Sequence, residues 1–410
     1  MKNPIKYILY IAVLFFMIMA CNNEDEYTST PITGGDISWY KTEFREAYYK
    51  LQEAWTDVVE MTENDVFTVD NHYILKNGSP FEIRGMVYVP GYPGYIPWEI
   101  ENNSTLPVQL TDRIDTDLED IKAMGANTIR FWHAPKYCYE AVRNTGGLYI
   151  LQTIWIEVDS LDFQDINFKE SIKTRIRTIV DRIYSAYPDN NPPILAYNIG
   201  NELSNNAINS TNIAHPEIDS FSGNYIVTGS GISATEAFIA EMGDYLKTYE
   251  FNKYGRVSLV SYANHIVSAD LLQVPFLDFR SHNVYSNNIS YFRSNTQLGS
   301  STNSQYQGWI EELKAMFPNE PLLITETGLS VSPNAPHVGS PNYGYGGNTV
   351  EEQATKILQN VEDIATATAP IAGVCIHEYL DAWWKYSLED SYTQDPDDVE
   401  EWFGLVKLVR

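Results

Sequence analysis

Short apolar runs alternate with longer segments of helical periodicity along most of this chain. The runs are four to nine residues long, as buried strands of a parallel sheet are, and between them apolar residues recur three to four positions apart. The predicted strands are residues 84–89, 128–132, 148–156, 194–199, 257–262, 279–285, 322–325 and 373–379. The predicted helices are residues 112–124, 136–143, 168–187, 234–251, 305–316 and 350–365. This alternation predicts an α/β domain at residues 66–410 with the (β/α)8, or TIM barrel, architecture.

Two smaller elements precede the predicted barrel. Apolar residues recur at helical spacing from residue 39 to residue 60, which predicts an N-terminal helix within residues 36–65. Residues 66–83 contain three short strand-like runs separated by turns, which predicts a small β-hairpin leading into the barrel. The sequence has no internal repeat and no second core, so we expect one catalytic domain.

The first 20 residues have the character of an export signal. Lys2 and Lys6 precede an apolar run at residues 7–19, and this run is too short to span a membrane. The run ends at Ala20 and Cys21, an arrangement that resembles the bacterial lipobox, in which the cysteine is lipidated and becomes the mature N-terminus. We therefore expect a lipoprotein signal peptide at residues 1–20.

Residues 21–35 are polar and predict a tether between the anchor and the folded domain. An acidic stretch at residues 22–26 resembles the export tag of surface lipoproteins in some gram-negative bacteria, and a merely solvated tether is the alternative. We expect the protein to be secreted and lipid-anchored to the outer membrane through Cys21, with exposure on the cell surface as a further expectation.

Acidic residues outnumber basic ones two to one. The chain has 54 Asp and Glu against 27 Lys and Arg, which gives a net charge of −27. Such a chain repels phosphate backbones and anionic lipid surfaces, so we expect no nucleic-acid partner and no membrane contact other than the lipid anchor. The expected partner is a neutral β-linked oligosaccharide or polysaccharide, bound by a monomer.

Cysteine and histidine usage argues against a disulfide scaffold and against a metal site. Only Cys138 and Cys375 follow Cys21, and we expect both to be buried free thiols, with a disulfide between them as the alternative. The seven histidines are scattered, and His377-Glu378 has no second histidine four residues later. The sequence predicts neither a metal nor a cofactor.

Two predicted strands each lead into a glutamate. The run at residues 194–199 leads to Glu202, and the run at residues 322–325 leads to Glu326. The C-terminal ends of barrel strands meet at one face, where such folds keep their chemistry. A retaining glycosidase needs two carboxyl groups about 5–5.5 Å apart, one protonated as general acid and one ionised as nucleophile. The pair therefore predicts this reaction class.

Polar residues at neighbouring strand ends fit the same chemistry. Asn201 can hold the 2-hydroxyl of a sugar beside Glu202. Arg130 can hold a carboxylate ionised, with a structural salt bridge as the alternative. The hydroxyl of Tyr285 can donate to the nucleophile and stabilise its charged form. The remaining substrate-binding candidates at these strand ends are His133 and His282.

Aromatic residues are the candidates for sugar stacking. The loop at residues 88–98 includes Tyr88 and Trp98, and its Pro and Gly residues restrict its shape, which favours an oligomeric glycan as substrate. Packing of this loop on itself as a lid is the alternative. Trp383 and Trp384 follow the last predicted strand, and we expect one of them to stack on a sugar and the other to belong to the core.

Taken together, the motifs resemble the clan A glycoside hydrolases, which are retaining (β/α)8 enzymes that include families 2, 5 and 72. The resemblance covers roughly residues 66–410 and rests on Gly85 with Tyr88, Asn127-Thr-Ile-Arg130, Gly200-Asn-Glu202, Asn283-Val-Tyr285, Thr325-Glu326-Thr-Gly328 and the final tryptophans. It implies that Glu202 is the acid/base and Glu326 the nucleophile. It also implies that the remaining motif residues line subsite −1, namely Arg130, Asn201, His282, Tyr285 and Trp383 or Trp384.

Within this clan the hairpin at residues 71–85 is similar to the entry of the family 72 β-1,3-glucanosyltransferases and of the family 2 catalytic domain. The chain differs from family 72 because it lacks the disulfides of that family. It differs from family 2 because it lacks room for the N-terminal sugar-binding β domains of that family. We expect an endo-β-1,3-glucanase or a glucanosyltransferase. The alternatives are a β-mannan or other β-glycan hydrolase of the family 5 type and, from another class, a non-catalytic glycan-binding surface lipoprotein.

Overall fold

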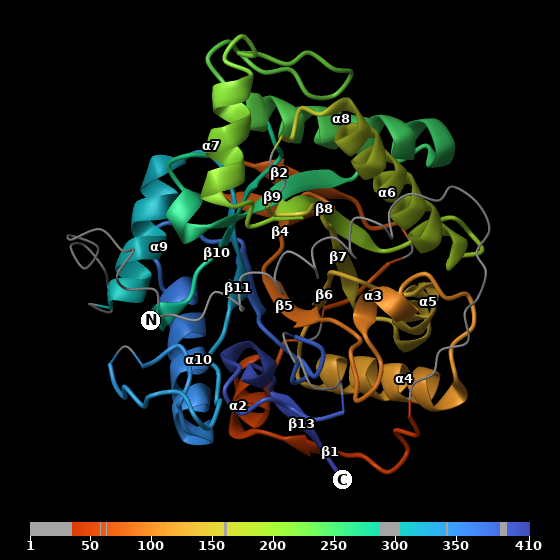
Figure 1. The fold of residues 1–410 in the computed structure, drawn as a ribbon, viewed down its shortest axis with the longest axis vertical. Coiled ribbons are helices and arrows are strands. Elements are labelled where there is room, and N and C mark those ends of the chain that lie inside the picture. Colours follow the sequence, from red (N-terminus) through yellow and green to blue (C-terminus); the bar gives the residue numbers. More distant parts are fainter. Residues whose placement is uncertain are drawn as a thin grey trace, which may run out of the picture. The chain divides into compact units, whose positions relative to one another are not determined.

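Eight parallel strands form a closed barrel, which confirms the predicted (β/α)8 fold. The computed structural model describes residues 35–57, 59–62, 64–159, 162–287, 304–341, 343–385 and 392–410. The barrel strands are β5 (Ile83–Tyr88), β6 (Thr128–Phe131), β7 (Tyr149–Ile154), β8 (Ile194–Asn201), β9 (Leu259–His265), β10 (Arg280–Asn283), β11 (Leu322–Thr327) and β12 (Gly373–Ile376). They pair in chain order, and β12 pairs with β5 to close the sheet (Figure 1). Each corresponds to a strand predicted from the sequence.

Helices surround the barrel in Figure 1. The six predicted helices are present as α4 (Val108–Ala123), α5 (Lys136–Thr145), α6 (Ile166–Ser185), α8 (Ala234–Tyr254), α9 (Gln305–Met316) and α10 (Val350–Ala365). The sequence analysis missed α3 (Pro97–Ile100) and α7 (Asn205–Ala214), and the described part of the chain also contains the 3-10 helices η1 (Ile266–Ser268) and η3 (Val399–Trp402). The Ser204 side chain caps α7 by accepting from Ala207 N, but the polar composition of this helix hides its periodicity.

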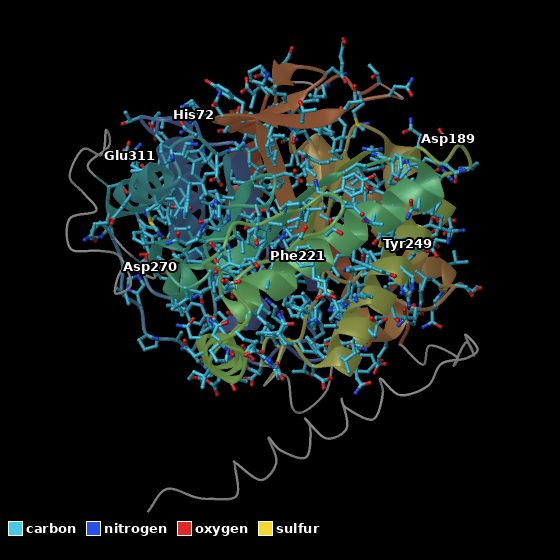
Figure 2. All side chains as sticks on the ribbon, turned by 90° about the horizontal axis from the view of Figure 1, so that it is seen from above. His72, Asp189, Phe221, Tyr249, Asp270 and Glu311 are labelled. Atoms are coloured by element: carbon cyan, nitrogen blue, oxygen red, sulfur yellow. The ribbon has the colours of Figure 1, made fainter. Side chains whose placement is uncertain are left out.

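A small sheet packs at the N-terminal end of the barrel. It consists of β2 (Phe67–Asp70), β3 (Tyr73–Lys76) and β4 (Ser79–Pro80), and His72 marks the turn between β2 and β3 in Figure 2. The rings of Phe67 and Phe81 lie 4.8 and 5.3 Å from that of Tyr149, the first residue of β7. The predicted hairpin is confirmed, although its third strand is β4 and Ile83 already belongs to the barrel.

The N-terminal segment differs from the prediction of a single helix. Residues Lys41–Phe44 form β1, which pairs antiparallel with β13 (Val406–Val409), and only Glu46–Ala54 form a helix, α2. Trp39 is 70% exposed and lies in a turn. The helical spacing of apolar residues is real in α2, but upstream of it pairing with the last strand of the chain decides the conformation. The predicted helix was therefore too long.

A buried ion pair fastens this N-terminal segment to the loop after β12. Arg45 donates from Nη1 and Nη2 to the two carboxylate oxygens of Asp381, at 2.6 and 2.7 Å. Both side chains are nearly inaccessible, at 4% and 0% exposure. The Asp381 carboxylate also accepts from Gly404 N at 3.1 Å, so one buried carboxylate joins three parts of the chain that are remote in sequence.

We expect Arg45→Ala to lower the free energy of unfolding by about 3–5 kcal/mol, because it leaves the Asp381 carboxylate buried and unpaired. Urea denaturation followed by tryptophan fluorescence measures the change. Lys50→Ala is the matched control, since Lys50 pairs with Glu53 on the exposed face of α2 and such pairs contribute about 0–1 kcal/mol. Equal shifts in the two variants would show that the buried pair has no special role.

The two described cysteines are buried free thiols, as predicted. Cys375 on β12 lies against Gly85 of β5, where an added Cβ would stand 2.4 Å from the sulfur, so Gly85 leaves room for the thiol inside the barrel. None of the helices in the described part of the chain has the length and apolar character needed to cross a membrane. The predicted signal peptide, Cys21 and the tether up to residue 34 lie outside the described residues.

Candidate active site

The C-terminal ends of the strands bring the two predicted glutamates together. Glu326 lies on β11, and Glu202 follows β8 where the chain turns through positive φ angles, 85° at Gly200 and 49° at Glu202. Glu202 N donates to Ala263 O and Leu203 N donates to the hydroxyl of Tyr262, both at 2.9 Å. These bonds to β9 hold the turn that presents the Glu202 side chain to the barrel axis.

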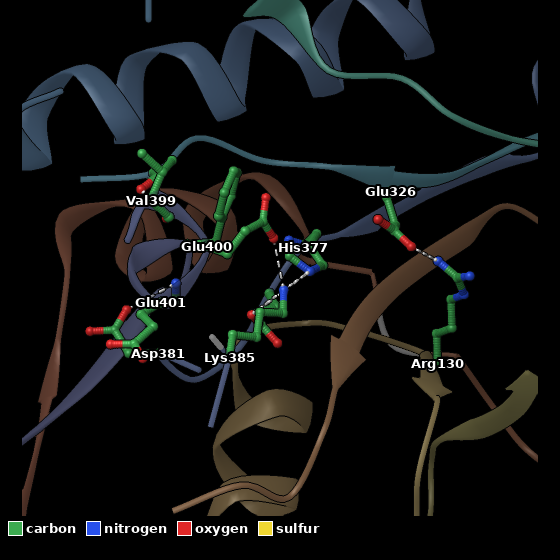
Figure 3. A network of polar contacts seen from close by, with 12 residues as sticks. Arg130, Glu326, His377, Asp381, Lys385, Val399, Glu400 and Glu401 are labelled. Carbon is green, nitrogen blue, oxygen red and sulfur yellow. Dashed lines mark hydrogen bonds and ion pairs between the residues drawn. The ribbon is translucent and has the colours of Figure 1, made fainter. Parts of the chain in front are cut away.

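The carboxylate of Glu326 is held by two donors. Arg130 Nη1 donates to Glu326 Oε1 at 2.6 Å (Figure 3), and the hydroxyl of Tyr285 donates to Oε2 at 2.7 Å. The Arg130 guanidinium is fully buried, so this ion pair is shielded from water. Both oxygens of Glu326 are thus oriented, as a nucleophile requires.

Glu202 has the opposite environment. Loss of surrounding water raises its pKa to about 8, and the nearby negative charge of Glu326 adds to the increase. The only hydrogen bond to its side chain among the described residues comes from Asn283 Nδ2, which donates to Oε1 at 2.8 Å. Glu202 is therefore protonated at neutral pH, which is the state in which a carboxylic acid can give its proton to a leaving group.

An amide pair links the two glutamates. Asn201 Oδ1 accepts from Arg130 Nη2 at 2.8 Å and from Asn283 Nδ2 at 3.1 Å. Arg130, which also bonds Glu326, and Asn283, which also bonds Glu202, therefore share this one acceptor. This network fixes the relative orientation of the two carboxyl groups, which a double displacement at an acetal carbon requires.

Of the polar residues predicted for the site, the structure brings Arg130, Asn201 and Tyr285 into the network around the two glutamates. His282 is corrected: Asn283 points to the barrel axis, so His282 before it points to the opposite side of β10. The side chain of His282 is buried, and burial together with the charge of Arg280 lowers its pKa to about 3. Asn283 takes the place that the sequence analysis gave to His282.

The aromatic candidates divide into two groups. The rings of Trp98 and Trp384 lie 5.6 Å apart edge to face, and the His133 ring lies 6.5 Å from that of Trp98. Trp98 is 42% exposed, so this group has a surface to offer to a ligand. An added Cβ at Gly91 would stand 2.1 Å from Trp384, so the glycine in the loop after β5 is what lets the indole lie there.

Tyr88 and Trp383 belong to the core instead. The hydroxyl of Tyr88 lies 2.5 Å from that of Tyr92 and donates to Asp117 of α4 at 3.2 Å, and its side chain is fully buried between barrel and helix. Trp383 is 7% exposed and packs on Tyr40. The assignment of Tyr88 to the substrate is thus corrected, and of the two tryptophans Trp384 is the one beside the site.

Sequence reasoning missed a second polar group at the site, formed by His377, Glu378, Lys385 and Glu400. Lys385 Nζ lies 3.0 Å from Glu400 Oε2 and 3.4 Å from His377 Nε2 (Figure 3), and it lies 3.6 Å from Glu378 Oε1. The His377 ring lies 6.0 Å from that of Tyr285. Burial raises the pKa of Glu400 to about 7, and the charge of Glu326 adds to this. Glu400 belongs to an acidic stretch at residues 395–401, and from the sequence alone this stretch is interpreted as a solvated loop.

The described residues offer no group of three or more His, Cys, Asp or Glu side chains that could hold a metal ion. The acid–base pair and its hydrogen-bond network can act without one, because protonation of the leaving oxygen and attack at carbon need only the two carboxyl groups.

Comparison with known proteins gives structural neighbours alone. No family model and no curated protein matches the sequence. A β-glucuronidase of Bacteroides uniformis superimposes with a TM-score of 0.56 at 14% identity, covering 84% of this chain and 35% of that one. The β-glucuronidase of Ruminococcus gnavus gives 0.51 at 14% identity over 77% and 46%, and a putative β-galactosidase of Bacteroides fragilis gives 0.52 at 17% identity over 84% and 42%.

This chain shares its barrel fold with β-glycosidases. At these identities the likeness establishes the fold, and the chain spans between a third and half of the length of those neighbours. The activity rests on the geometry of Glu202 and Glu326.

Proposed function

We propose that the protein is a retaining β-glycosidase that acts on a β-linked polysaccharide. The observation that carries this proposal is the division between two carboxyl groups at the strand ends: Glu326 bonded to Arg130 and Tyr285, and Glu202 with its pKa raised to about 8. The β-glycosidases among the structural neighbours, named as β-glucuronidase and β-galactosidase, support the general class.

In the proposed mechanism Glu326 attacks the anomeric carbon while Glu202 protonates the leaving oxygen, which gives a covalent glycosyl-enzyme and an ionised Glu202. Glu202 then takes a proton from the incoming acceptor, which attacks the anomeric carbon and displaces Glu326. Water as acceptor gives hydrolysis, and a sugar hydroxyl gives transglycosylation. Two inversions leave the β configuration unchanged.

For the substrate we propose a β-1,3-glucan, cleaved internally or transferred. The support is the resemblance of the entry hairpin to the family 72 glucanosyltransferases, together with the aromatic pair Trp98 and Trp384 beside the site. The test is product analysis by chromatography after incubation with laminarin, barley β-glucan, mannan and cellulose, with aryl β-glucuronide and β-galactoside added as small substrates. Oligosaccharides from laminarin support the proposal, whereas products from mannan alone would favour the family 5 type of activity.

The same set of glycans distinguishes catalysis from glycan binding without catalysis. Retention of laminarin on the protein without any release of product would favour the non-catalytic alternative, a glycan-binding surface lipoprotein. The raised pKa of Glu202 beside Glu326 argues against that alternative, because a binding protein gains nothing from holding a carboxyl group neutral.

We also propose that the chain is anchored to the outer membrane by lipid on Cys21. We expect Cys21→Ser to be released from membranes with its specific activity unchanged, because the residues that carry the chemistry all lie beyond residue 129. Fractionation of cells that produce each form, followed by activity assays on the fractions, measures both effects. Membrane association of the serine variant would rule out the lipobox interpretation.

A further inference from the structure

The polar group around Lys385 lies beside the nucleophile and takes no part in the proposed mechanism. The indole ring of Trp132 connects the two: its centroid lies 5.8 Å from the Arg130 guanidinium and 5.4 Å from Lys385 Nζ. On the other side the His377 ring lies between Lys385 and Tyr285, whose hydroxyl bonds Glu326. In Figure 3 Glu400, His377 and Lys385 gather across from Glu326 and Arg130.

The ammonium group of Lys385 is covered by the protein. Its Nζ lies 3.0 Å from Glu400 Oε2 and 3.4 Å from His377 Nε2, and Glu378 Oε1 lies at the longer distance of 3.6 Å. The Lys385 side chain is only 7% exposed. Lys385 therefore faces carboxylates of the protein itself and is poorly placed to receive the carboxylate of a ligand.

Glu400 is the accessible member of this group. Its side chain is 29% exposed, against 7% for Lys385 and 2% for Glu378. Its backbone position is fixed because Glu400 N donates to Asp398 Oδ1 at 2.8 Å. Asp398 is the residue that caps the start of η3. A carboxylate accepts about four hydrogen bonds, so its contact with Lys385 leaves capacity for a ligand hydroxyl.

We propose that Glu400, held by Lys385, is a specificity-determining residue that accepts a hydroxyl of the bound sugar and excludes sugars that carry a carboxylate. The inference rests on the proposed glycosidase function and names its substrate class as uncharged glycans. A hydroxyl donates to the Glu400 oxygen, whereas a uronic acid would bring a second carboxylate against it, next to a lysine that the protein covers. Juxtaposed like charges disfavour binding strongly.

The test compares laminarin with laminarin oxidised at C6 to the carboxylate, or mannan with oxidised mannan should mannan be the better substrate. The ratio of kcat/KM for the neutral to the oxidised glycan is the readout. At pH 8, where Glu400 with its pKa of about 7 is ionised, we expect wild type to prefer the neutral glycan by roughly 100-fold, the scale set by opposing like charges. Glu400→Gln should lower this ratio at least tenfold, since it removes the negative charge and frees Lys385.

A second measurement and a control variant keep the result interpretable. The wild-type ratio should rise as pH rises through about 7, the pKa of Glu400, and this rise should be absent in Glu400→Gln, a difference that a general loss of folding cannot produce. Glu99→Gln is the control, since Glu99 is an exposed carboxylate on α3 that has no ion pair among the described residues. Circular dichroism confirms that each variant is folded.

Equal cleavage of both glycans by wild type, or an unchanged ratio in Glu400→Gln, would overturn this inference and leave the glycosidase intact. Absence of cleavage of every β-linked substrate by wild type would overturn the proposed function itself, and this inference with it.

Discussion

Replacement of Glu326 by alanine should reduce turnover by roughly 10⁵-fold or more, the scale seen when the nucleophile of a covalent mechanism is removed. The reason is that no other carboxylate among the described residues is oriented by both Arg130 and Tyr285. Fluorescence and circular dichroism should show an intact fold, because Glu326 lies at a strand end, although the variant should be less stable since it leaves the buried Arg130 guanidinium without its carboxylate partner. Glu119→Ala, on the exposed face of α4, is the matched control.

Azide gives the sharper measurement on Glu326→Ala. The vacated side chain leaves room for a small anion on the face of the sugar that the nucleophile attacks, while Glu202 can still protonate the leaving group. An activated aryl β-glycoside or oligosaccharide should therefore yield an α-glycosyl azide, the product of one inversion, detectable by NMR. Turnover by Glu326→Ala close to that of wild type, without azide, would remove the assignment.

Replacement of Glu202 by glutamine should lower kcat/KM by about 10²–10⁴-fold on substrates with poor leaving groups, the usual contribution of a general acid. Substrates with good leaving groups should keep fast formation of the glycosyl-enzyme, because their leaving oxygen needs no proton. Burst kinetics with 2,4-dinitrophenyl and unactivated glycosides separate the two cases. An equal loss on both classes of substrate would indicate a structural role for Glu202.

The same residue should set the alkaline limb of the pH profile. The pKa of Glu202 is raised from its ordinary value of 4.5 to about 8, so the group is protonated and active as an acid below that pH and ionised above it. We expect kcat/KM of wild type to fall as pH rises through about 8 and this limb to disappear in Glu202→Gln. A limb that stays in place in the variant would assign the titration to another group.

The sequence predicts the barrel and its catalytic pair because both depend on local patterns. Buried parallel strands read as apolar runs, and the eight runs correspond to β5 through β12. The C-terminal ends of all barrel strands lie at one face, so a glutamate after one strand and another on a second strand must approach each other whatever the details of packing. Arg130, Asn201 and Tyr285 follow from the same rule.

The face of a strand to which each side chain points was harder to predict from the sequence. A bulge or a shift of one residue exchanges the two faces of a strand, so His282 and Asn283 are equally good candidates in the sequence and only the structure places Asn283 in the site. Tyr88 shows the same limit, since it ends β5 but points to α4 rather than to the barrel axis.

Contacts between residues remote in sequence were decided by the tertiary structure alone. The pairing of β1 with β13, the bond between Arg45 and Asp381 and the contact of Lys385 with Glu400 each join segments that no local periodicity relates. The sequence by itself determined the order of strands and helices and the two carboxyl groups at their ends, because these are properties of short stretches of chain. Which of the two is neutral, and which side chains surround them, depends on burial and on charges brought close by folding, and these exist only in the tertiary structure.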